Sequence, residues 1–280
     1  MICRRYYIDI LGAIACLLFS SIAMGDLKLD AVLNNAEAQA LASHQTWIKL
    51  GHYESNRSSS SGLLSEIHSA SFSLAPNGRK SPKAELEATI KAFGAPIVDN
   101  PNAHAQCLFP GRYIWLSSLL DFNAAGFPSI SCTAFKAWTK GESIKSISLL
   151  YATGYLGNPA SFYGHTLLKF NSDNSAHSAL LDVSMNYGAI VPSGEGPIPY
   201  IFKGVTGGYD AGFSHIQYYF HNHNYGELEL RDIWEYELSL SQFQVDLIMG
   251  HLWEMLGKKY TYYFFKKKLW LPNGRSFGVG

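Results

Sequence analysis

Apolar residues recur at every third or fourth position over much of the first half of the chain, which is the spacing of amphipathic helices. The clearest boundary signals flank one such stretch: Ser81 suits a helix cap, Pro82 suits the first turn, and Gly94 suits the end. We therefore predict a mostly helical module up to about residue 140. Its helices are expected over Leu27–Ile48, Lys83–Phe93, Pro110–Leu120 and Thr133–Trp138, with a polar loop over Ser55–Ser61.

The pattern changes beyond Gly141, where apolar and polar residues alternate and β-branched residues become frequent. A last amphipathic stretch, Leu240–Leu256, predicts a helix with Ser239 or Ser241 as its cap. The chain is therefore expected to have an α+β fold, with a helical module over 26–140 followed by an α+β domain over 141–265. The expected strands are Ile144–Ala152, His165–Phe170, Ala179–Met185, His215–His221 and Leu228–Leu238.

The first 25 residues have the features of a cleavable export signal. Two arginines precede an apolar stretch over Ile8–Ile22, and Ala23-Met24-Gly25 then supplies the small residues that a signal peptidase reads. Cleavage is expected before Asp26, which predicts a periplasmic protein. A lipobox ending at Cys16 and a retained anchor helix are the alternatives, although the apolar stretch is shorter than a membrane span needs. No later segment is apolar enough to cross a bilayer.

Removal of the leader would leave two cysteines, Cys107 and Cys132. In an oxidising compartment, two cysteines favour one disulfide, here closing a loop of about 25 residues. The alternative is that one of them is a nucleophile. That is the weaker interpretation, because neither follows a glycine-rich turn into a clear helix.

Composition excludes some classes of partner and leaves others open. Formal net charge is zero and only 16% of the residues are charged, so no nucleic-acid footprint is expected. Aromatic residues make up 14%, which fits a surface for an acyl-bearing substrate and equally fits a β-rich core. No cofactor is expected.

One stretch could carry chemistry: GNPASFYGHTLLKF, from Gly157 to Phe170. Gly164 permits close backbone approach, and His165 then begins an apolar strand, where a general base would be held on a fixed element. A lone histidine at a strand start is more often structural. Ser161 is an alternative nucleophile, but no strand–turn–helix elbow surrounds it, so a turn role is favoured.

The stretch from Ala152 to Phe170 resembles the NPaSxFGHTLLR-type motif of the Lnb N-terminal periplasmic domain family, with departures at Tyr163 and Lys169. The resemblance covers nearly the whole mature chain, from about Leu41 to Phe265. Its other parts are Tyr225–Tyr236 and His251–Glu254 downstream, and Trp47–Tyr53, Ser71–Gly78, Glu85–Phe93 and Cys107–Tyr113 upstream, the last four in a helical module that often precedes the family's domain.

The resemblance implies a circularly permuted papain-like fold, NlpC-related, in which the histidine precedes the cysteine. Family members include lipoprotein N-acyltransferases, in which a thiolate takes an acyl chain as a thioester and passes it to an amine. His165 would be the general base, acting on a lipid, acyl donor or other cell-envelope substrate. The substrate would lie near Asn158, Phe162 and Tyr163.

Other residues could support or replace this site. His251 lies on a helix that could face and orient His165, or it could pack against the sheet. Asp232 could be the third polar partner, although an ion-pair network with Arg231 and Glu235 is the simpler interpretation. A zinc site is suggested only faintly, by His215, His221 and His223, and no metal is expected.

The family's nucleophile is missing. An Asn-Cys pair should open a helix after the aromatic segment Tyr260–Phe265, where the helix N-terminus would favour the thiolate. The chain instead continues with Lys266–Lys268 and a tail to Gly280 that contains no cysteine. Removing one base from the A-rich lysine codons lets the next codons read Asn-Cys-Gly. We hypothesise a one-base frameshift, the alternative being a divergent tail.

If the frame is as printed, thioester chemistry is impossible and residues 266–280 should be poorly ordered. The rival hypothesis is then a noncatalytic periplasmic binding or scaffold module for lipid or cell-wall fragments. Among catalytic functions, transfer and hydrolysis fit the residues equally well.

Overall fold

The computed structural model describes residues 28–37, 39–57, 59–97, 99–139, 144–157, 161–162, 164–172, 178–263, 269–270 and 276–277. The predicted export signal lies outside them, as do residues 140–143, where we expected the division between modules. Of the predicted tail, Leu269–Trp270 (β9) pairs with Ser276–Phe277 (β10), and the rest lies outside the described residues.

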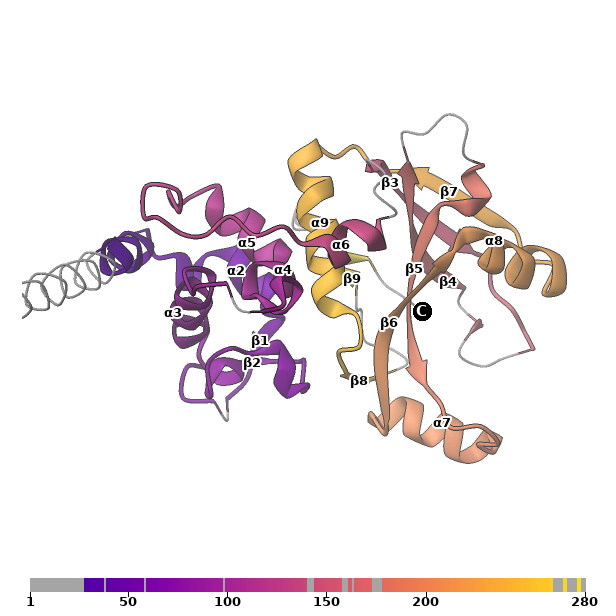
Figure 1. Ribbon diagram of the computed structural model, residues 1–280. Coiled ribbons are helices and arrows are strands. Elements are labelled where there is room, and N and C mark those ends of the chain that lie inside the picture. The colour runs from indigo at the N-terminus through magenta and orange to yellow at the C-terminus, as the bar shows by residue number, and fades with distance from the viewer. Residues whose placement is uncertain are drawn as a thin grey trace, which may run out of the picture.

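The first half is a module of short helices (Figure 1). The expected boundary signals are confirmed in α3 (Pro82–Phe93): the Ser81 side chain accepts a hydrogen bond from the amide of Ala84, and Gly94 is the C-cap. The expected helices α5 (Pro110–Ser117) and α6 (Thr133–Trp138) are also present. The remaining elements are α2 (Gln45–Leu50), α4 (Ala105–Leu108) and the 3-10 turns η1 (Leu41–Ser43), η2 (Ala70–Phe72), η3 (Gly78–Lys80) and η4 (Pro101–Ala103).

The expected single helix over 27–48 is wrong. Residues 28–37 are helical, but Ala40 has a left-handed backbone (φ 51°), which interrupts the helical path before η1. The His44 side chain then accepts from the amide of Thr46 and begins α2 as a separate helix. A small hairpin, β1 (Tyr53–Ser55) with β2 (Leu63–Ser65), flanks the expected polar loop and was not predicted.

The second half is built on a six-stranded antiparallel sheet, so the α+β class is confirmed. The strand order is β7-β3-β4-β5-β6-β8. Strand β3 (Ile144–Ala152) has the predicted bounds, and β4 (His165–Ser172) begins as predicted and runs two residues further. The other strands are β5 (Val183–Ile190), β6 (Tyr209–Gln217), β7 (Ile233–Glu237) and β8 (Tyr260–Tyr262), and α7 (Pro197–Thr206) connects β5 to β6.

Three predicted strands were misplaced, each because a local turn or helix took part of the apolar run. Ser178 caps a 3-10 turn, η6 (Ala179–Leu181), so β5 begins only at Val183. The chain turns into helix α8 (Tyr218–His221) directly after β6. A π-helix, η7 (Asn222–Leu228), follows and delays β7 to Ile233.

The two faces of the sheet are covered by different elements. On one face Leu149, Leu168 and Phe170 pack against Trp138 of α6 and against α9 (Gln242–Met255). Helix α9 begins with a capping box in which Ser241 and Gln244 exchange hydrogen bonds, so Ser241 is the cap. On the other face, Lys169 lies against Tyr218 of α8 and His165 lies against Tyr225 of η7. These two helices carry the chain from β6 to β7, an edge strand of the sheet.

Helix α9 stands between the helical module and the sheet (Figure 1). It meets α5 almost backbone to backbone, since a Cβ built on Gly250 would lie 2.7 Å from the Gly111 nitrogen. One apolar core runs through the contact and contains Leu41 and Phe72 of the helical module together with Tyr187 and Tyr260 of the sheet. The two halves are therefore folded around shared core residues.

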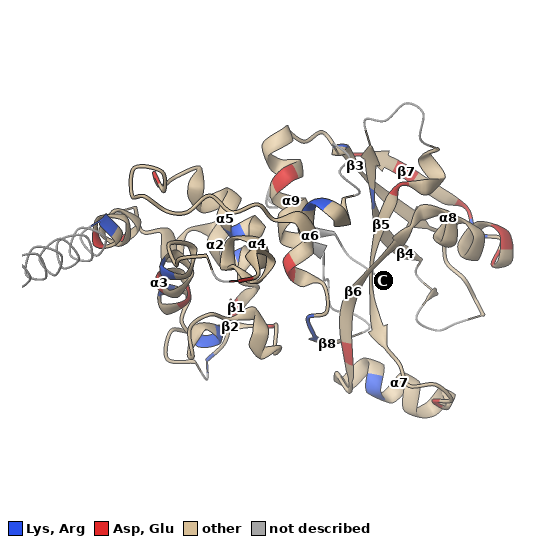
Figure 2. Ribbon diagram, viewed as in Figure 1, with Lys and Arg blue, Asp and Glu red and all other residues tan. Residues whose placement is uncertain are grey.

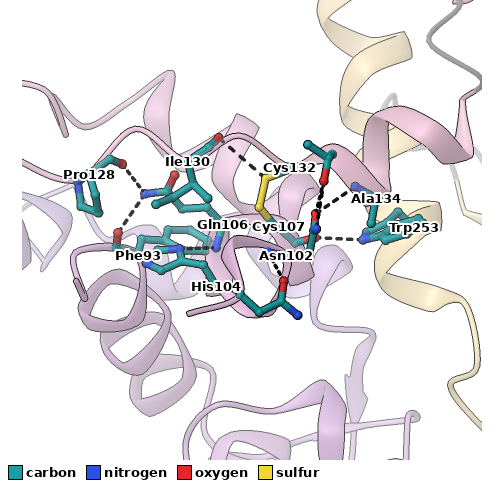
Figure 3. The surroundings of a disulfide bond; sticks show 12 residues. Phe93, Asn102, His104, Gln106, Cys107, Pro128, Ile130, Cys132, Ala134 and Trp253 are labelled. Atoms are coloured by element: carbon teal, nitrogen blue, oxygen red, sulfur yellow. Dashed lines mark hydrogen bonds between the residues drawn. A yellow bond between two sulfur atoms is a disulfide. The ribbon is translucent and has the colours of Figure 1, made fainter. Parts of the chain in front are cut away.

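The predicted disulfide is confirmed: the Cys107 and Cys132 sulfurs are bonded at 2.00 Å (Figure 3). Neither thiol is therefore available as a nucleophile while the bond stands. The indole nitrogen of Trp253 on α9 donates to the Cys107 carbonyl at 2.9 Å, which connects the disulfide loop to the second half of the chain.

Candidate functional site

Several connections gather at the end of the sheet where β4 begins. His165 pairs with Ala152, the last residue of β3, and Ala152 pairs with Ile233, the first residue of β7. Strand β5 leaves the sheet at this same end, at Ile190. We call this the His165 end of the sheet. It collects the β3–β4 connection, α7 and the segment that precedes β7.

His165 makes one side-chain hydrogen bond of known geometry. Its Nε2 lies 2.5 Å from Oδ1 of Asn186, which stands on the neighbouring strand β5. An amide oxygen only accepts, so Nε2 carries a proton and Nδ1 keeps the lone pair of the neutral ring. The bond fixes the tautomer and aims the basic nitrogen away from Asn186.

The surroundings keep His165 neutral. Burial is the largest influence and lowers the pKa of His165; the bond to Asn186 raises it, Arg231 lowers it and Glu229 raises it. The net direction is downward. The ring is thus an uncharged acceptor near neutral pH, the state that a general base requires.

One ring of η7 contacts His165, and a ring of α8 packs behind it. The Tyr225 ring centre is 5.6 Å from the His165 ring centre. The His221 ring stacks on the Tyr225 ring, also at 5.6 Å. His221 is 7% exposed, and its Nε2 has no hydrogen-bond partner among the described residues. Burial first, and His165 second, lower the pKa of His221 to about 4.

A buried arginine fastens this cover to the sheet. Arg231 donates from Nε to the Thr153 carbonyl at 2.6 Å and from Nη2 to the Ala152 carbonyl at 3.0 Å, and it pairs with Glu229 at 2.9 Å. Its guanidinium lies 4.8 Å from the centre of the Tyr225 ring. Arg231 therefore connects the end of β3, beside His165, to the segment that carries Tyr225.

Two protein-family models match parts of the chain. Residues 134–267 match the model of the Lnb N-terminal periplasmic domain. This matched segment, which we call the Lnb domain, is similar to that family. Residues 39–119 match a domain of unknown function (DUF7843). Neither the curated proteins nor the solved structures gave a match.

The Lnb domain contains the whole cluster of His165, Asn186, Tyr225 and Arg231. The family describes a periplasmic domain, which agrees with the export predicted from the sequence. Among the described helices of the chain, none has the length and apolar character needed to traverse a bilayer.

Asn186 is the residue of the candidate site that sequence reasoning missed. It is the single amide in the mostly apolar strand Val183–Ile190, which is a faint local signal. Strand register places Asn186 opposite Leu167, within reach of His165. Such a long-range pairing cannot be predicted from one sequence. The predicted partners of His165 have other contacts.

Asp232 is exposed, and its main chain exchanges hydrogen bonds with Thr153. The expected ion-pair network is also different. Arg231 pairs with Glu229, and Glu235 pairs with the buried Lys169 at 2.7 Å.

His251 lies on α9, whose contacts are with the helical module and the opposite face of the Lnb sheet. Its Nδ1 is 3.3 Å from Glu254 and its Nε2 is 3.0 Å from Nε2 of His52. Glu254 also accepts from the Arg112 amide at 2.8 Å. His251 is thus part of the joint between the two halves of the chain.

Ser161 lies in the connection between β3 and β4 and forms hydrogen bonds through its main chain. Its carbonyl accepts from the amides of Tyr155 and Gly164, at 2.9 and 3.1 Å. Phe162 is 52% exposed. The other two expected substrate residues, Asn158 and Tyr163, lie outside the described residues.

The three histidines weighed as zinc ligands are in separate settings. His215 packs against Trp138 on the α9 side, His221 stacks on Tyr225, and His223 pairs with Glu227 at 2.7 Å. The part of the chain that the structure describes holds no group of three or more His, Cys, Asp or Glu side chains suited to a metal ion.

Proposed function

We propose that the Lnb domain of this chain has the active-site frame of a cysteine-dependent acyltransferase or hydrolase, with His165 as general base and Asn186 as its positioning residue. The observation that carries the proposal is the hydrogen bond from His165 Nε2 to Asn186 Oδ1. It leaves Nδ1 to take a proton, as the base does in Cys-His-Asn constellations of papain-like enzymes.

The proposed reaction follows from those roles. Nδ1 of His165 accepts the proton of a thiol, and the resulting thiolate attacks the carbonyl carbon of an acyl donor. The donor's leaving group departs with a proton returned by His165, and a thioester remains. An amine or a water molecule then attacks the thioester, which releases the thiol and completes transfer or hydrolysis.

The chain as printed contains no thiol for this role. Its four cysteines are two in the predicted leader and two in the disulfide. The Asn-Cys pair of the family is absent after Tyr260–Phe265. Removal of one base from the lysine codons of 266–268 would let the following codons encode Asn-Cys. We therefore propose that the side chains around His165 are still arranged for catalysis and that the frameshift removed the nucleophilic cysteine.

The test compares two proteins. One is encoded by the unaltered gene, and the other by a gene from which one base has been removed in the codons of Lys266–Lys268. The repaired protein is expected to form an acyl adduct with an activated acyl ester, on the restored cysteine and cleavable by hydroxylamine. His165→Ala should abolish adduct formation, and Asn186→Ala should slow it by about 10- to 100-fold. Asn186→Asp should restore part of the rate.

Resequencing of the lysine codons comes first. A confirmed frame with no Asn-Cys in the alternative frame would remove the proposed nucleophile. A repaired cysteine that forms its adduct equally fast with and without His165 would remove the proposed base.

A second candidate function is favoured by the absence of a free thiol from the described residues. It is a noncatalytic periplasmic module that binds lipid or cell-wall fragments. In that case the unaltered protein should retain such ligands, and His165→Ala should leave the retention unchanged.

A further inference from the structure

The hydrogen bond to Asn186 holds one atom of the His165 ring and restrains rotation of the ring only weakly. In an imidazole, Nε2 lies closer than Nδ1 to the axis of the Cβ–Cγ bond. Rotation about that bond therefore moves the hydrogen-bonded nitrogen less than the basic one, and this torsion has broad energy minima. A second contact, against the ring itself, is needed to fix the direction of Nδ1.

Tyr225 provides that contact. Its ring lies against the imidazole of His165, with 5.6 Å between the ring centres and 46° between the planes. This separation is within the range of favourable aromatic pairs. The flat tyrosine ring obstructs rotation, because an edge of the imidazole would have to move into it.

The Tyr225 ring is itself held by two neighbours. The His221 ring stacks on it, with 8° between the planes. The guanidinium of Arg231 lies 4.8 Å from the centre of the Tyr225 ring, and the Arg231 amide donates to the Tyr225 carbonyl at 2.9 Å. Both the ring and the main chain of Tyr225 are therefore attached to Arg231.

Arg231 attaches this ring to the backbone beside His165. Few positions of the Lnb domain are basic (Figure 2), and Arg231 is one whose side chain is buried, with 1% exposed. Its guanidinium donates to the carbonyls of Ala152 and Thr153. Ala152 is the residue that pairs with His165 between β3 and β4. The base and the ring that limits its rotation are thus fixed to the same point of the sheet.

We propose that Tyr225 and Arg231 are positioning residues for His165, with the Tyr225 ring setting the plane of the imidazole and Arg231 holding that ring in place. Both act through the imidazole. The catalytic consequence rests on the function proposed above, whereas the position of the imidazole can be measured in the chain as printed.

Protonation of His165 reports on the same contact. Polar groups from three elements act on it: Asn186 from β5, Arg231 and Glu229 from the segment before β7, and His221 from α8. Burial is nevertheless the largest influence, and it lowers the pKa of His165. Because the Tyr225 ring is part of what buries the imidazole, removal of that ring should raise the pKa of His165 toward its ordinary 6.5.

The first test uses NMR of the unaltered chain with ¹³C-labelled histidine, and a His165→Ala sample assigns the resonance. Relaxation of the ring carbons measures how freely the imidazole turns. Tyr225→Leu should make the ring more mobile and raise its pKa by about 0.5 or more. Tyr225→Phe keeps the ring and should change neither quantity.

Tyr219→Leu is the matched control for Tyr225→Leu. Tyr219 lies on α8, and its ring stacks on His223. The same substitution there should leave the mobility and the pKa of His165 at their wild-type values. Thermal unfolding establishes that each variant is folded before the spectra are compared.

The second test measures formation of the acyl adduct in the frame-repaired protein. Tyr225→Leu and Arg231→Lys should slow it by about tenfold or more, the latter because lysine cannot donate to both carbonyls in the geometry of the guanidinium. Tyr225→Phe and Tyr219→Leu should stay within about twofold of wild type. The acid limb of the pH–rate profile should move upward in Tyr225→Leu, together with the pKa measured by NMR.

The proposal is overturned if Tyr225→Leu leaves the mobility and the pKa of the His165 ring unchanged. It is equally overturned if Tyr225→Phe behaves like Tyr225→Leu, since the hydroxyl rather than the ring would then be responsible. If no repaired protein forms an adduct, the proposed function fails, and the NMR measurements alone decide whether Tyr225 positions the imidazole.

Discussion

His52 and His251 face each other across the joint between the helical module and α9, with 3.0 Å between their Nε2 atoms and their rings stacked at 23°. One ring must donate and the other accept, so the pair shares a single proton. On its far side His251 contacts Glu254, which belongs with Glu85 to a buried group around Arg112. The joint is thus built from polar contacts enclosed by apolar ones.

Loss of one charge in this buried group should weaken the whole fold. Arg112 is 1% exposed, and its guanidinium lies 4.3 Å from the Phe109 ring centre and 2.6 Å from Glu85. Glu85→Gln should reduce the free energy of unfolding by about 1–3 kcal/mol, because the buried guanidinium would lose its nearer carboxylate and keep Glu254, 3.6 Å from its Nε. Urea unfolding measures the change. Glu37→Gln, in the exposed pair with Lys83, is the control and should leave the midpoint unaltered.

The free energy of unfolding should decrease as the pH is lowered, because His221 is buried in its neutral form. Its folded-state pKa, about 4, lies below the ordinary 6.5, so the unfolded chain binds the proton first. The contribution of neutral His221 is complete above pH 6.5 and is lost as the pH falls toward 4. The loss should be on the order of 2 kcal/mol after allowance for solvent screening.

His221→Phe should flatten the unfolding free energy between pH 6.5 and 4. His165, whose pKa is also lowered, contributes in the same direction and leaves a residual slope. His223→Phe removes the more exposed histidine of the same segment, which pairs with Glu227, and is the matched substitution with which the His221→Phe profile is compared. A His221→Phe protein with an unchanged slope would contradict this assignment.

The disulfide should stabilise the protein mainly through the unfolded chain. Cys107 and Cys132 are 25 residues apart, and closing a loop of that size is worth about 3.5 kcal/mol in the chain-entropy model. The double variant Cys107→Ser/Cys132→Ser should lose that amount in denaturant unfolding. A reducing agent should lower the midpoint of wild type and leave the double variant unaffected.

A methyl group at the α5–α9 contact should disrupt it. A Cβ on Gly111 would lie 2.6 Å from the His251 nitrogen, a distance that side chains do not reach without backbone movement. Gly111→Ala should lower the melting temperature by several degrees, for a cost of about 1–3 kcal/mol. Gly196→Ala, where the nearest atom would be 3.7 Å away, should change it little.

Local signals predicted those elements that local chemistry decides. Ser81, Pro82 and Gly94 bounded α3, and the alternation of SIKSISLLY predicted β3. The start of α7 was not recognised, although Pro197 and Pro199 stand in its first turn, where proline is tolerated. The apolar run around Tyr218 was taken for strand, because short apolar runs do not distinguish strand from helix.

The candidate site was half predicted. His165 was singled out from its glycine and the strand that follows, and the family resemblance supported it. Asn186, Tyr225 and Arg231 reach it through strand register and through the return of α8 and η7 to β7. Such contacts depend on the folded topology. The family resemblance marked the Tyr225–Tyr236 segment but not its contact with His165.

The contact of Gly111 with Gly250 bears on how the gene can be divided. The segment that matches the Lnb family includes α9. One side of that helix, however, is covered by residues of the helical module. An Lnb segment expressed by itself would expose the side of α9 against which α5 now packs. Co-production of the two pieces, rather than either piece in isolation, is the sensible way to study this domain in parts.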